Sequence, residues 1–272
     1  MLGATGKTGR AVTAALLRLG YAVRGISRTP QEHDATDQVD WRRADLLTGE
    51  GLEQALTGVD AAYLIVPNVH PDEVEIVARV TRLATQAGVG RIVYHSVADP
   101  DDARMAHHLR KGRAEQVLRE LRPDAVVLRP GAYQQNLLPA ALAGHLEVPY
   151  RLSAPFSLVD LDDVAEVASL ALAGQLEAGS THLLGGPEEL TVTEMAQAAG
   201  ETLGRPVTAS TISPAQWQAG PGAGVGGSAL TDLLAMFAAY DESGFTVAPS
   251  PLTRLLGRPP ASWTHLLSKE TS

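Results

Sequence analysis

Short runs of apolar and β-branched residues alternate with longer helical patterns over the first 130 residues of the chain. The runs are bounded by turn residues and predict buried strands at residues 21–27, 41–44, 60–66, 91–96 and 124–129. Helical periodicity predicts helices over residues 7–19, 72–87 and 103–121. Because strands and helices that alternate at this spacing are joined by right-handed crossovers, the pattern indicates an α/β fold with a doubly wound parallel sheet.

The pattern after residue 150 is looser and mostly helical. Asp162 or Asp163 is expected to cap a helix that runs to about residue 172. Thr191 and Glu194 have the spacing of a capping box, and Ser228 is expected to cap a later helix. These elements predict a smaller helical lobe after the sheet-containing part of the chain.

The two patterns divide the chain into two expected domains, which are interleaved, so that the boundary is approximate. The sheet-containing α/β domain is expected over residues 1–150, and the smaller, mostly helical lobe, which is expected to hold a substrate, over residues 151–272. The glycine-rich stretch at residues 220–227 is the best candidate for a flexible linker.

Composition and charge narrow the class of protein. The chain has 272 residues, of which 44% are hydrophobic, and no apolar run approaches the roughly 18 residues of a membrane helix. The absence of cysteine excludes disulfides and thiolate metal sites and agrees with a cytoplasmic protein. A net charge of -9 argues against direct binding of nucleic acid. The eight histidines lack metal-site spacing, so no metal is expected.

Three glycines spaced three residues apart precede the first predicted helix. Gly3, Gly6 and Gly9 allow the backbone to turn tightly and to approach a diphosphate at the positive end of the helix. A tight turn without a ligand is the alternative, but the following helix and strand favour dinucleotide binding. The side chains that can add hydrogen-bond donors to this loop are Thr5, Lys7 and Thr8.

The position of the glycine loop in the chain differs from that of an ordinary dinucleotide-binding loop in one respect. Such a loop normally follows a complete buried strand, whereas only Met1 and Leu2 precede Gly3. The loss of a central strand removes several apolar side chains from the core, at about 1.5–3 kcal/mol each. The first strand is therefore expected to be truncated, either because the true start lies upstream, which we favour, or because the loop is poorly anchored.

Arg28 follows the second predicted strand, where a protein that binds NAD carries an acidic residue for the ribose 2′-hydroxyl. A guanidinium there suits a 2′-phosphate instead, which predicts NADP(H) rather than NAD(H). The alternative for Arg28 is a solvated surface side chain. Asp45 follows the third strand and is expected either to accept a hydrogen bond from the adenine amino group or to cap a helix near Thr48.

Motifs along nearly the whole chain resemble those of the NmrA-like atypical short-chain dehydrogenase/reductases. The resemblance implies a Rossmann domain with a small C-terminal lobe, and a dinucleotide, usually NADP(H), across the strand ends. Relatives in this family include NADPH-dependent quinone and dye reductases, and also regulators that bind the cofactor without evident turnover. The matching motifs are residues 3–9, 27–28, 44–46, 91–96, 127–133, 158–165 and 240–244.

The resemblance also implies a place for each part of the cofactor. The glycine loop would hold the diphosphate and Arg28 the 2′-phosphate, all at the carboxyl ends of strands. The other implied contacts are Asp45 and Leu46 at the adenine, Val66 and Pro67 beside the ribose, and Pro130, Gly131 and Tyr133 near the nicotinamide.

The catalytic residues of the wider superfamily are only partly matched. Its members use a tyrosine acid, a lysine four residues later that also holds the nicotinamide ribose, and a serine that polarises the substrate oxygen. Lys111 and Ser96 match two of these positions, but His107 replaces the tyrosine. His107 is then either a proton donor or a partly solvated helix residue, and Lys111 is either catalytic or exposed. Tyr133 is expected either to contact the substrate or to pack.

Two functions remain open on these residues. The first is an NADP(H)-dependent oxidoreductase that reduces a quinone or small conjugated carbonyl by hydride transfer, with solvent protonating the acceptor. The second is a non-catalytic regulator that senses NADP(H). A sugar-nucleotide epimerase is weaker because its chemistry also relies on the tyrosine. The expected partner is a small-molecule substrate, with a homodimer as the possible assembly.

Overall fold

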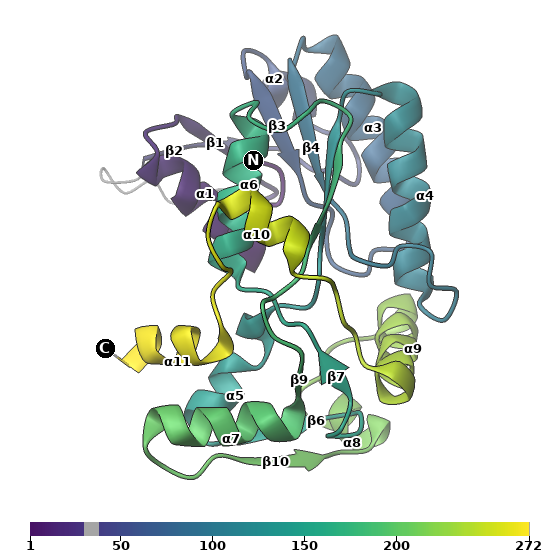
Figure 1. Cartoon of the computed structure of the whole chain (residues 1–272). Helices are drawn as coiled ribbons and strands as arrows, with labels where there is room; N and C mark the ends of the chain where they lie inside the picture. The colour runs from purple at the N-terminus through teal and green to yellow at the C-terminus, as the bar shows by residue number, and fades with distance from the viewer. Residues whose placement is uncertain (30–37, 272) are drawn as a thin grey trace. The chain divides into compact units, whose positions relative to one another are not determined.

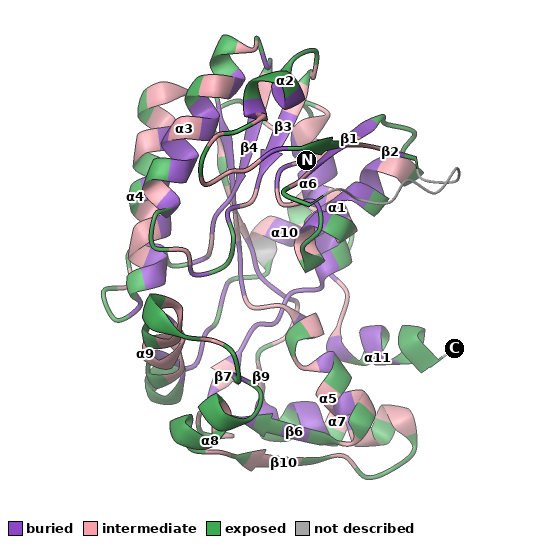
Figure 2. Ribbon diagram, turned by 180° about the vertical axis from the view of Figure 1, so that it is seen from behind, coloured by how far each residue is buried: buried purple, intermediate pink, exposed green. Residues whose placement is uncertain are grey.

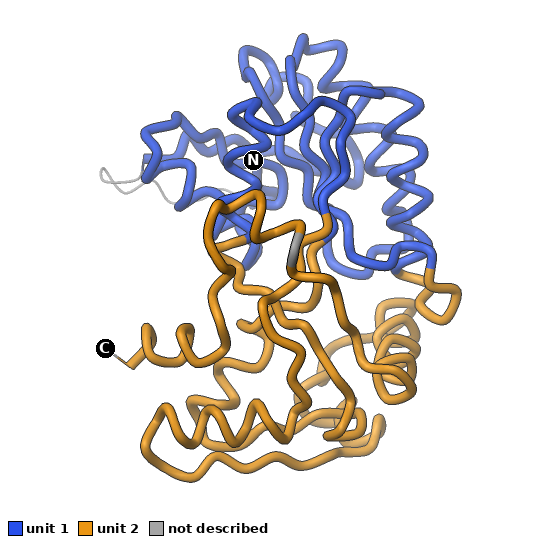
Figure 3. Tube along the Cα trace, in the orientation of Figure 1, with its two compact units in different colours: residues 1–101, 108–129, 164–182 blue, residues 102–107, 130–163, 183–272 orange. Residues whose placement is uncertain are grey.

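The structure is a computed structural model that describes residues 1–29 and 38–271 (Figure 1). The chain forms two compact units (Figure 3). Unit 1 contains residues 1–101, 108–129 and 164–182, and unit 2 contains residues 102–107, 130–163 and 183–272. The chain therefore passes between the units several times along its length.

Unit 1 is built on parallel strands, which confirms the predicted α/β class. Strand β1 (Val23–Ser27) pairs in parallel with β2 (Val39–Arg43). Strand β3 (Ala61–Leu64) pairs in parallel with β4 (Arg91–His95), which pairs in parallel with β5 (Val126–Pro130). Strand β8 (Thr181–Leu184) follows β5 in the sheet.

Leu2 connects the two groups of strands. It forms parallel bridges with Ile26 of β1 and with Leu64 of β3, and its amide donates a hydrogen bond to the carbonyl of Tyr63 at 3.0 Å. The carbonyl of Met1 accepts a hydrogen bond from the amide of Ile26, also at 3.0 Å. The central strand expected before the glycine loop is therefore present as two residues.

Helices cover both faces of this sheet because each carries an apolar stripe. Helices α2 (Leu52–Leu56), α3 (Glu73–Gln86) and α4 (Ala106–Leu121) pack on one face, where their buried residues join those of the strands in one hydrophobic core. Helices α1 (Lys7–Arg18) and α6 (Leu161–Leu172) lie on the opposite face. Strands β3, β4 and β5 between these layers are buried along most of their length, whereas β2 is exposed at its end (Figure 2).

Unit 2 is mostly helical, as expected for the second part of the chain. Two short strand pairs accompany its helices: β6 (His145–Val148) with β10 (Thr208–Thr211) in parallel, and β7 (Pro155–Phe156) with β9 (Leu190–Thr191) antiparallel. The helices are η1 (Gln134–Asn136), α5 (Leu138–Ala143), α7 (Val192–Leu203), α8 (Pro214–Ala219), α9 (Gly227–Ser243), α10 (Ser250–Leu256) and α11 (Trp263–Thr271). No helix of the described residues is long and apolar enough to cross a bilayer.

One of the three predicted helix caps is correct. Thr191 and Glu194 form both hydrogen bonds of the capping box that begins α7. The prediction for α6 is wrong, because Asp160 accepts hydrogen bonds from the amides of the residues at 162 and 163, which lie inside the first turn. The prediction for α9 is also wrong: Gly226 is the N-cap, and Ser228 lies in the first turn.

Candidate functional site

Two of the three glycines in the loop at residues 3–9 are required by the fold itself. Gly3 has a φ of +78°, which side chains other than glycine adopt only with strain. A Cβ atom on Gly9 would stand 2.1 Å from the carbonyl oxygen of Gly3, a distance that no real contact allows. These two glycines therefore allow α1 to begin directly after the bridges that Leu2 forms with β1 and β3.

Gly6 differs from these two because nothing inside the chain excludes a side chain there. It is the N-cap of α1, it is exposed, its φ is −73°, and an added Cβ would meet only the carbonyl oxygen of Gly3 at 3.4 Å. Helix α1 has no side-chain cap and no acidic residue in its first turn. The positive end of a helix favours an anion in general, and Gly6 places no side chain of its own beside the first turn of α1.

Arg28 follows β1, where its side chain is exposed. The register of β1 with β2 places Arg43 opposite Ser27, so that a second exposed guanidinium belongs to the neighbouring strand end. Arg42, by contrast, forms an ion pair with Asp40 at 2.9 Å. Local patterns could not single out Arg43, because its position depends on the pairing of two strands separated by residues outside the described part of the chain.

Asp45 and Leu46 lie in the turn after β2. A carboxylate oxygen of Asp45 accepts a hydrogen bond from the amide of Leu47 at 2.8 Å. The helix cap considered for Asp45 is wrong, because residues 46–48 form a turn and the next helix begins at Leu52 with Gly51 as its N-cap. The guanidinium of Arg79 donates to the carbonyl oxygen of Leu46 at 3.1 Å and to that of Leu47. The contact of Asp45 with adenine stays a prediction.

The chain after β3 carries the other residues expected beside the ribose. Val66 is buried and Pro67 is exposed. Val69, three residues beyond Val66, has a φ of +49°, which is rare for a β-branched residue. Strained backbone of this kind is concentrated at binding and catalytic sites, and this position was not found from the sequence.

Lys111 is part of a buried polar cluster, so the exposed lysine considered from the sequence is wrong. Its side-chain nitrogen donates to a carboxylate oxygen of Glu73 at 2.6 Å, and Lys111 is only 7% exposed. The Tyr94 hydroxyl donates to the same oxygen of Glu73 at 2.6 Å. Burial, followed by the charge of Glu73, raises the pKa of Tyr94, which therefore keeps its proton.

Ser96 also forms a hydrogen bond with a buried polar side chain. Its hydroxyl donates to the carboxylate of Glu115, which is 2% exposed and also accepts three hydrogen bonds, of 2.6, 3.0 and 3.2 Å, from Arg129. His95 lies next to Ser96 and its Nδ1 is 2.7 Å from the hydroxyl of Tyr63. Burial lowers the pKa of His95 to about 3, so this imidazole is neutral near pH 7.

The remaining predicted residues belong to unit 2. His107 is 6% exposed, which makes the partly solvated helix histidine wrong. Pro130 and Gly131 are buried, and the amide of Gly131 donates to the carbonyl of Leu184 at 3.0 Å. Tyr133 is half-buried and forms a parallel bridge with Val159. Ser96 and Lys111 thus belong to unit 1, and His107 and Tyr133 to unit 2. Among the described residues no group of acidic and histidine side chains could hold a metal.

The parallel sheet, its flanking helices and the glycine loop define a Rossmann-type α/β protein. The model of the NmrA-like family matches residues 1–250, and the chain belongs to that family.

Three known proteins illustrate the likeness. A (4-alkanoyl-5-oxo-2,5-dihydrofuran-3-yl)methyl phosphate reductase from Streptomyces griseus is 32% identical over 213 residues, which cover 75% of this chain and 73% of the relative. The structure of an NADPH-dependent quinone oxidoreductase from Escherichia coli, solved with NADPH, matches with a TM-score of 0.83 at 23% sequence identity. The match covers 100% of this chain and 99% of the chain of the oxidoreductase. The structure of NmrA, a negative transcriptional regulator solved with NAD, matches with a TM-score of 0.78 at 17% sequence identity. This match covers 98% of this chain and 93% of the NmrA chain.

Proposed function

We propose that the protein is an NADP(H)-dependent oxidoreductase that reduces a quinone or another small conjugated carbonyl by hydride transfer. The observation that carries the proposal is the uncapped N-terminus of α1 behind an exposed glycine, with arginines after the next two strands. The reductase from Streptomyces griseus supports the reaction type, and its name describes a ring carbonyl next to a double bond. The solved quinone oxidoreductase with bound NADPH supports the cofactor.

The loop fits a dinucleotide because its N-cap residue, Gly6, has no side chain that could itself cap the first turn of α1. The amides of Lys7, Thr8 and Gly9 would hold the diphosphate, and Arg28 with Arg43 would hold the 2′-phosphate. The bound nicotinamide would supply the hydride. The other residues proposed to contact the cofactor are Thr5, Asp45, Leu46, Val66, Pro67, Lys111, Pro130, Gly131 and Tyr133.

Replacing Arg28 with alanine is expected to weaken NADPH binding about 10- to 100-fold and to leave NADH binding nearly unchanged. The reason is the loss of a charge-assisted hydrogen bond, worth about 1.5–3 kcal/mol, to a phosphate that NADH lacks. Arg43→Ala is expected to act in the same direction. Titration of each variant with both cofactors, followed by fluorescence or calorimetry, measures the effect.

Arg42→Ala is the matched control, because Arg42 lies on β2 next to Arg43 and forms an ion pair with Asp40. It should leave the preference for NADPH intact. Equal affinity of the parent protein for NADPH and NADH would contradict the proposed role of Arg28.

The absorbance of NADPH, followed with a panel of quinones and enones, tests turnover. We expect oxidation of NADPH that depends on both the protein and the acceptor. Solvent can protonate a quinone oxygen, so the reaction does not require the tyrosine that His107 replaces.

A non-catalytic NADP(H)-sensing regulator is the second candidate. It is favoured by His107 at the position of the superfamily tyrosine and by the structural likeness to a negative transcriptional regulator. NADPH binding without oxidation by any acceptor, at saturating cofactor, would favour the regulator over the enzyme.

A further inference from the structure

Glu73, the first residue of α3, is a fully buried carboxylate whose two hydrogen-bond donors converge on one oxygen. Its Oε1 atom accepts from Nζ of Lys111 and from the hydroxyl of Tyr94, both at 2.6 Å. Its Oε2 atom is also buried and has no hydrogen-bond partner among the residues that the structure describes. The carboxylate is therefore only partly satisfied. All three residues belong to unit 1.

Stability alone does not account for this buried ion pair. The attraction between two buried charges repays the cost of removing them from water only when their remaining hydrogen-bonding capacity is also satisfied. Here Oε2 of Glu73 lacks a donor. An apolar pair of similar volume is often at least as stable as a buried ion pair. The charges of Glu73 and Lys111 therefore point to a role in placing the ammonium group.

The ammonium of Lys111 is held by several groups of unit 1. Besides its bond to Glu73, it donates to the carbonyl oxygen of His95 at 3.3 Å, and its Nζ lies over the ring of Tyr94 at 5.4 Å from the ring centre. An ammonium has three N–H donors, so these two bonds leave the third for a ligand. His95 is the last residue of β4, and ligands of open α/β sheets bind at the carboxyl ends of strands.

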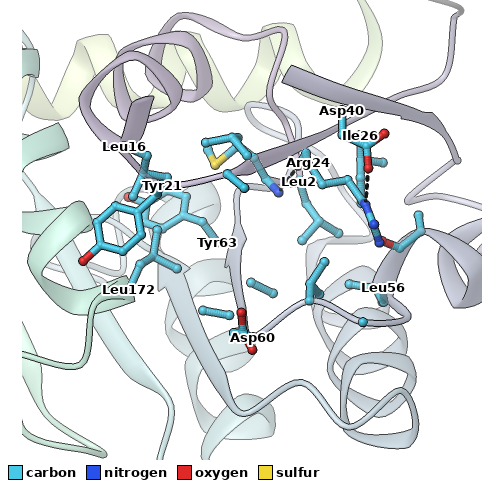
Figure 4. A pocket seen from close by; sticks show the side chains of 18 of the residues that line it. Leu2, Leu16, Tyr21, Arg24, Ile26, Asp40, Leu56, Asp60, Tyr63 and Leu172 are labelled. Carbon is cyan, nitrogen blue, oxygen red and sulfur yellow. Dashed lines mark hydrogen bonds and ion pairs between the residues drawn. The ribbon is translucent and has the colours of Figure 1, made fainter. Parts of the chain in front are cut away.

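The second polar pair on β4 does not balance the charge of Glu73. His95 and Tyr94 are adjacent along the strand, so their side chains lie on opposite faces of the sheet. The Nδ1 atom of His95 is 2.7 Å from the hydroxyl of Tyr63, a residue that lines a cavity of unit 1 (Figure 4). Burial, followed by the charge of Lys111, lowers the pKa of His95 to about 3, so this imidazole is neutral. Lys111 is thus the cation that compensates Glu73.

Glu73 also ends the segment that follows β3. This segment begins with Val66 and Pro67, which are proposed to lie beside the cofactor ribose, and α3 begins at its end. Val69 within it is buried and has a φ of +49°. Backbone of this kind persists only where the surrounding structure holds it. The ion pair between Glu73 and Lys111 ties the end of this segment to α4.

We propose that Glu73 is a positioning residue that places the ammonium of Lys111 for the nicotinamide ribose of the cofactor. This inference rests on the proposed function, because it takes NADP(H) as the ligand. Glu73 acts through Lys111 and does not touch the cofactor. The length of its side chain matters as well as its charge, because the carboxylate sets where the third N–H of the ammonium points.

Two ligands separate this role from a general loss of structure. NADPH carries the nicotinamide ribose, whereas 2′,5′-ADP is only the adenosine half of the cofactor with its 2′-phosphate. Glu73→Gln is expected to weaken NADPH binding about 10-fold, through loss of a charge-assisted contact, and to change the affinity for 2′,5′-ADP by less than about 2-fold. Calorimetric titration, at a temperature where circular dichroism shows both chains folded, measures the two affinities.

Glu73→Asp separates placement of the ammonium from compensation of its charge. Aspartate keeps the negative charge, so this variant should unfold at a higher temperature than Glu73→Gln, and it carries the same comparison of ligands if Glu73→Gln does not fold. Its side chain is one methylene shorter and draws the ammonium toward α3, so NADPH binding should still be about 10-fold weaker than in the parent. Parental NADPH affinity in Glu73→Asp would show that Glu73 only compensates charge, and the positioning role would be wrong.

A double-mutant cycle tests whether Glu73 acts through Lys111. Residues that act through one contact have effects that do not add. The chain with both Glu73→Gln and Lys111→Met should therefore bind NADPH no more weakly than the chain with Lys111→Met alone. Additive losses of NADPH affinity would contradict a role through Lys111.

Asp163→Asn is the matched control for the loss of a buried ion pair. Asp163 is buried and pairs with Arg258 at 2.8 Å in unit 2. This variant should unfold at a lower temperature than the parent and keep parental affinity for both ligands. If it weakens NADPH binding as much as Glu73→Gln does, the effect is not specific to Glu73 and the inference fails.

The two ligands also distinguish failure of this inference from failure of the proposed function. Equal weakening of NADPH and 2′,5′-ADP binding by Glu73→Gln, or parental affinity for both, would overturn the role of Glu73 and leave the cofactor in place. A parent chain that binds neither ligand would overturn the proposed function, and the role of Glu73 with it.

Discussion

Replacing Gly6 with serine is expected to weaken NADPH binding about 100-fold while leaving the protein at least as stable as the parent chain. Serine is a good N-cap, and its hydroxyl would accept a hydrogen bond from the amide of Thr8 or Gly9. The same amides are proposed to hold the diphosphate, and the loss of two charge-assisted hydrogen bonds is worth about 3 kcal/mol. Cofactor titration and thermal unfolding of the same sample measure the two effects.

Gly226→Ser is the matched control for this substitution. Gly226 is also an N-cap in extended backbone without a side-chain cap, and an added Cβ there meets nothing within 4 Å. It should gain similar stability and bind NADPH as the parent does. If Gly6→Ser binds NADPH with parental affinity, the diphosphate does not lie on the N-terminus of α1.

Replacing Lys111 with methionine is expected to lower the free energy of unfolding by about 3–5 kcal/mol at pH 7. Glu73 is fully buried, and without Lys111 its carboxylate loses the ion pair at 2.6 Å that compensates its charge. The hydrogen bond from Tyr94 does not supply a positive charge. Urea unfolding followed by circular dichroism gives the change directly.

The double variant Glu73→Gln with Lys111→Met separates the ion pair from any contact with the cofactor. Removal of both charges should restore most of the lost stability. If Lys111 also holds the nicotinamide ribose, the restored protein should still bind NADPH more weakly than the parent. A single Lys111→Met variant whose stability changes by less than about 0.5 kcal/mol would contradict the stabilising role of the ion pair between Lys111 and Glu73.

The sheet of unit 1 could be predicted because its strands are buried runs bounded by turn residues, which is a local signal. The predicted strands at 91–96 and 124–129 correspond to β4 (Arg91–His95) and β5 (Val126–Pro130). The residue that caps α6, by contrast, could not be identified from the sequence. Three aspartates stand within four positions there, and only the folded turn selects Asp160.

Residues of the candidate site could be proposed from the sequence where they are adjacent along the chain, as in the glycine loop and the Ser27–Arg28 pair. Arg43 was missed because its neighbour Ser27 lies on another strand. The burial of Lys111 was missed because its partner Glu73 is 38 residues away, on α3. A lysine in a helix rich in arginine and glutamate has the pattern of a solvated face until its distant carboxylate is known.

The interleaving of the two units has a consequence for synthesis on the ribosome. When residue 129 leaves the exit tunnel, the sheet of unit 1 still lacks the residues from 164 to 182, which supply most of α6 and the start of β8. Parallel sheets need both faces covered, so the part of the nascent sheet that α6 covers stays exposed beside α1 until that stretch has been translated. A nascent chain arrested between these points would be a natural client of chaperones that bind apolar surface.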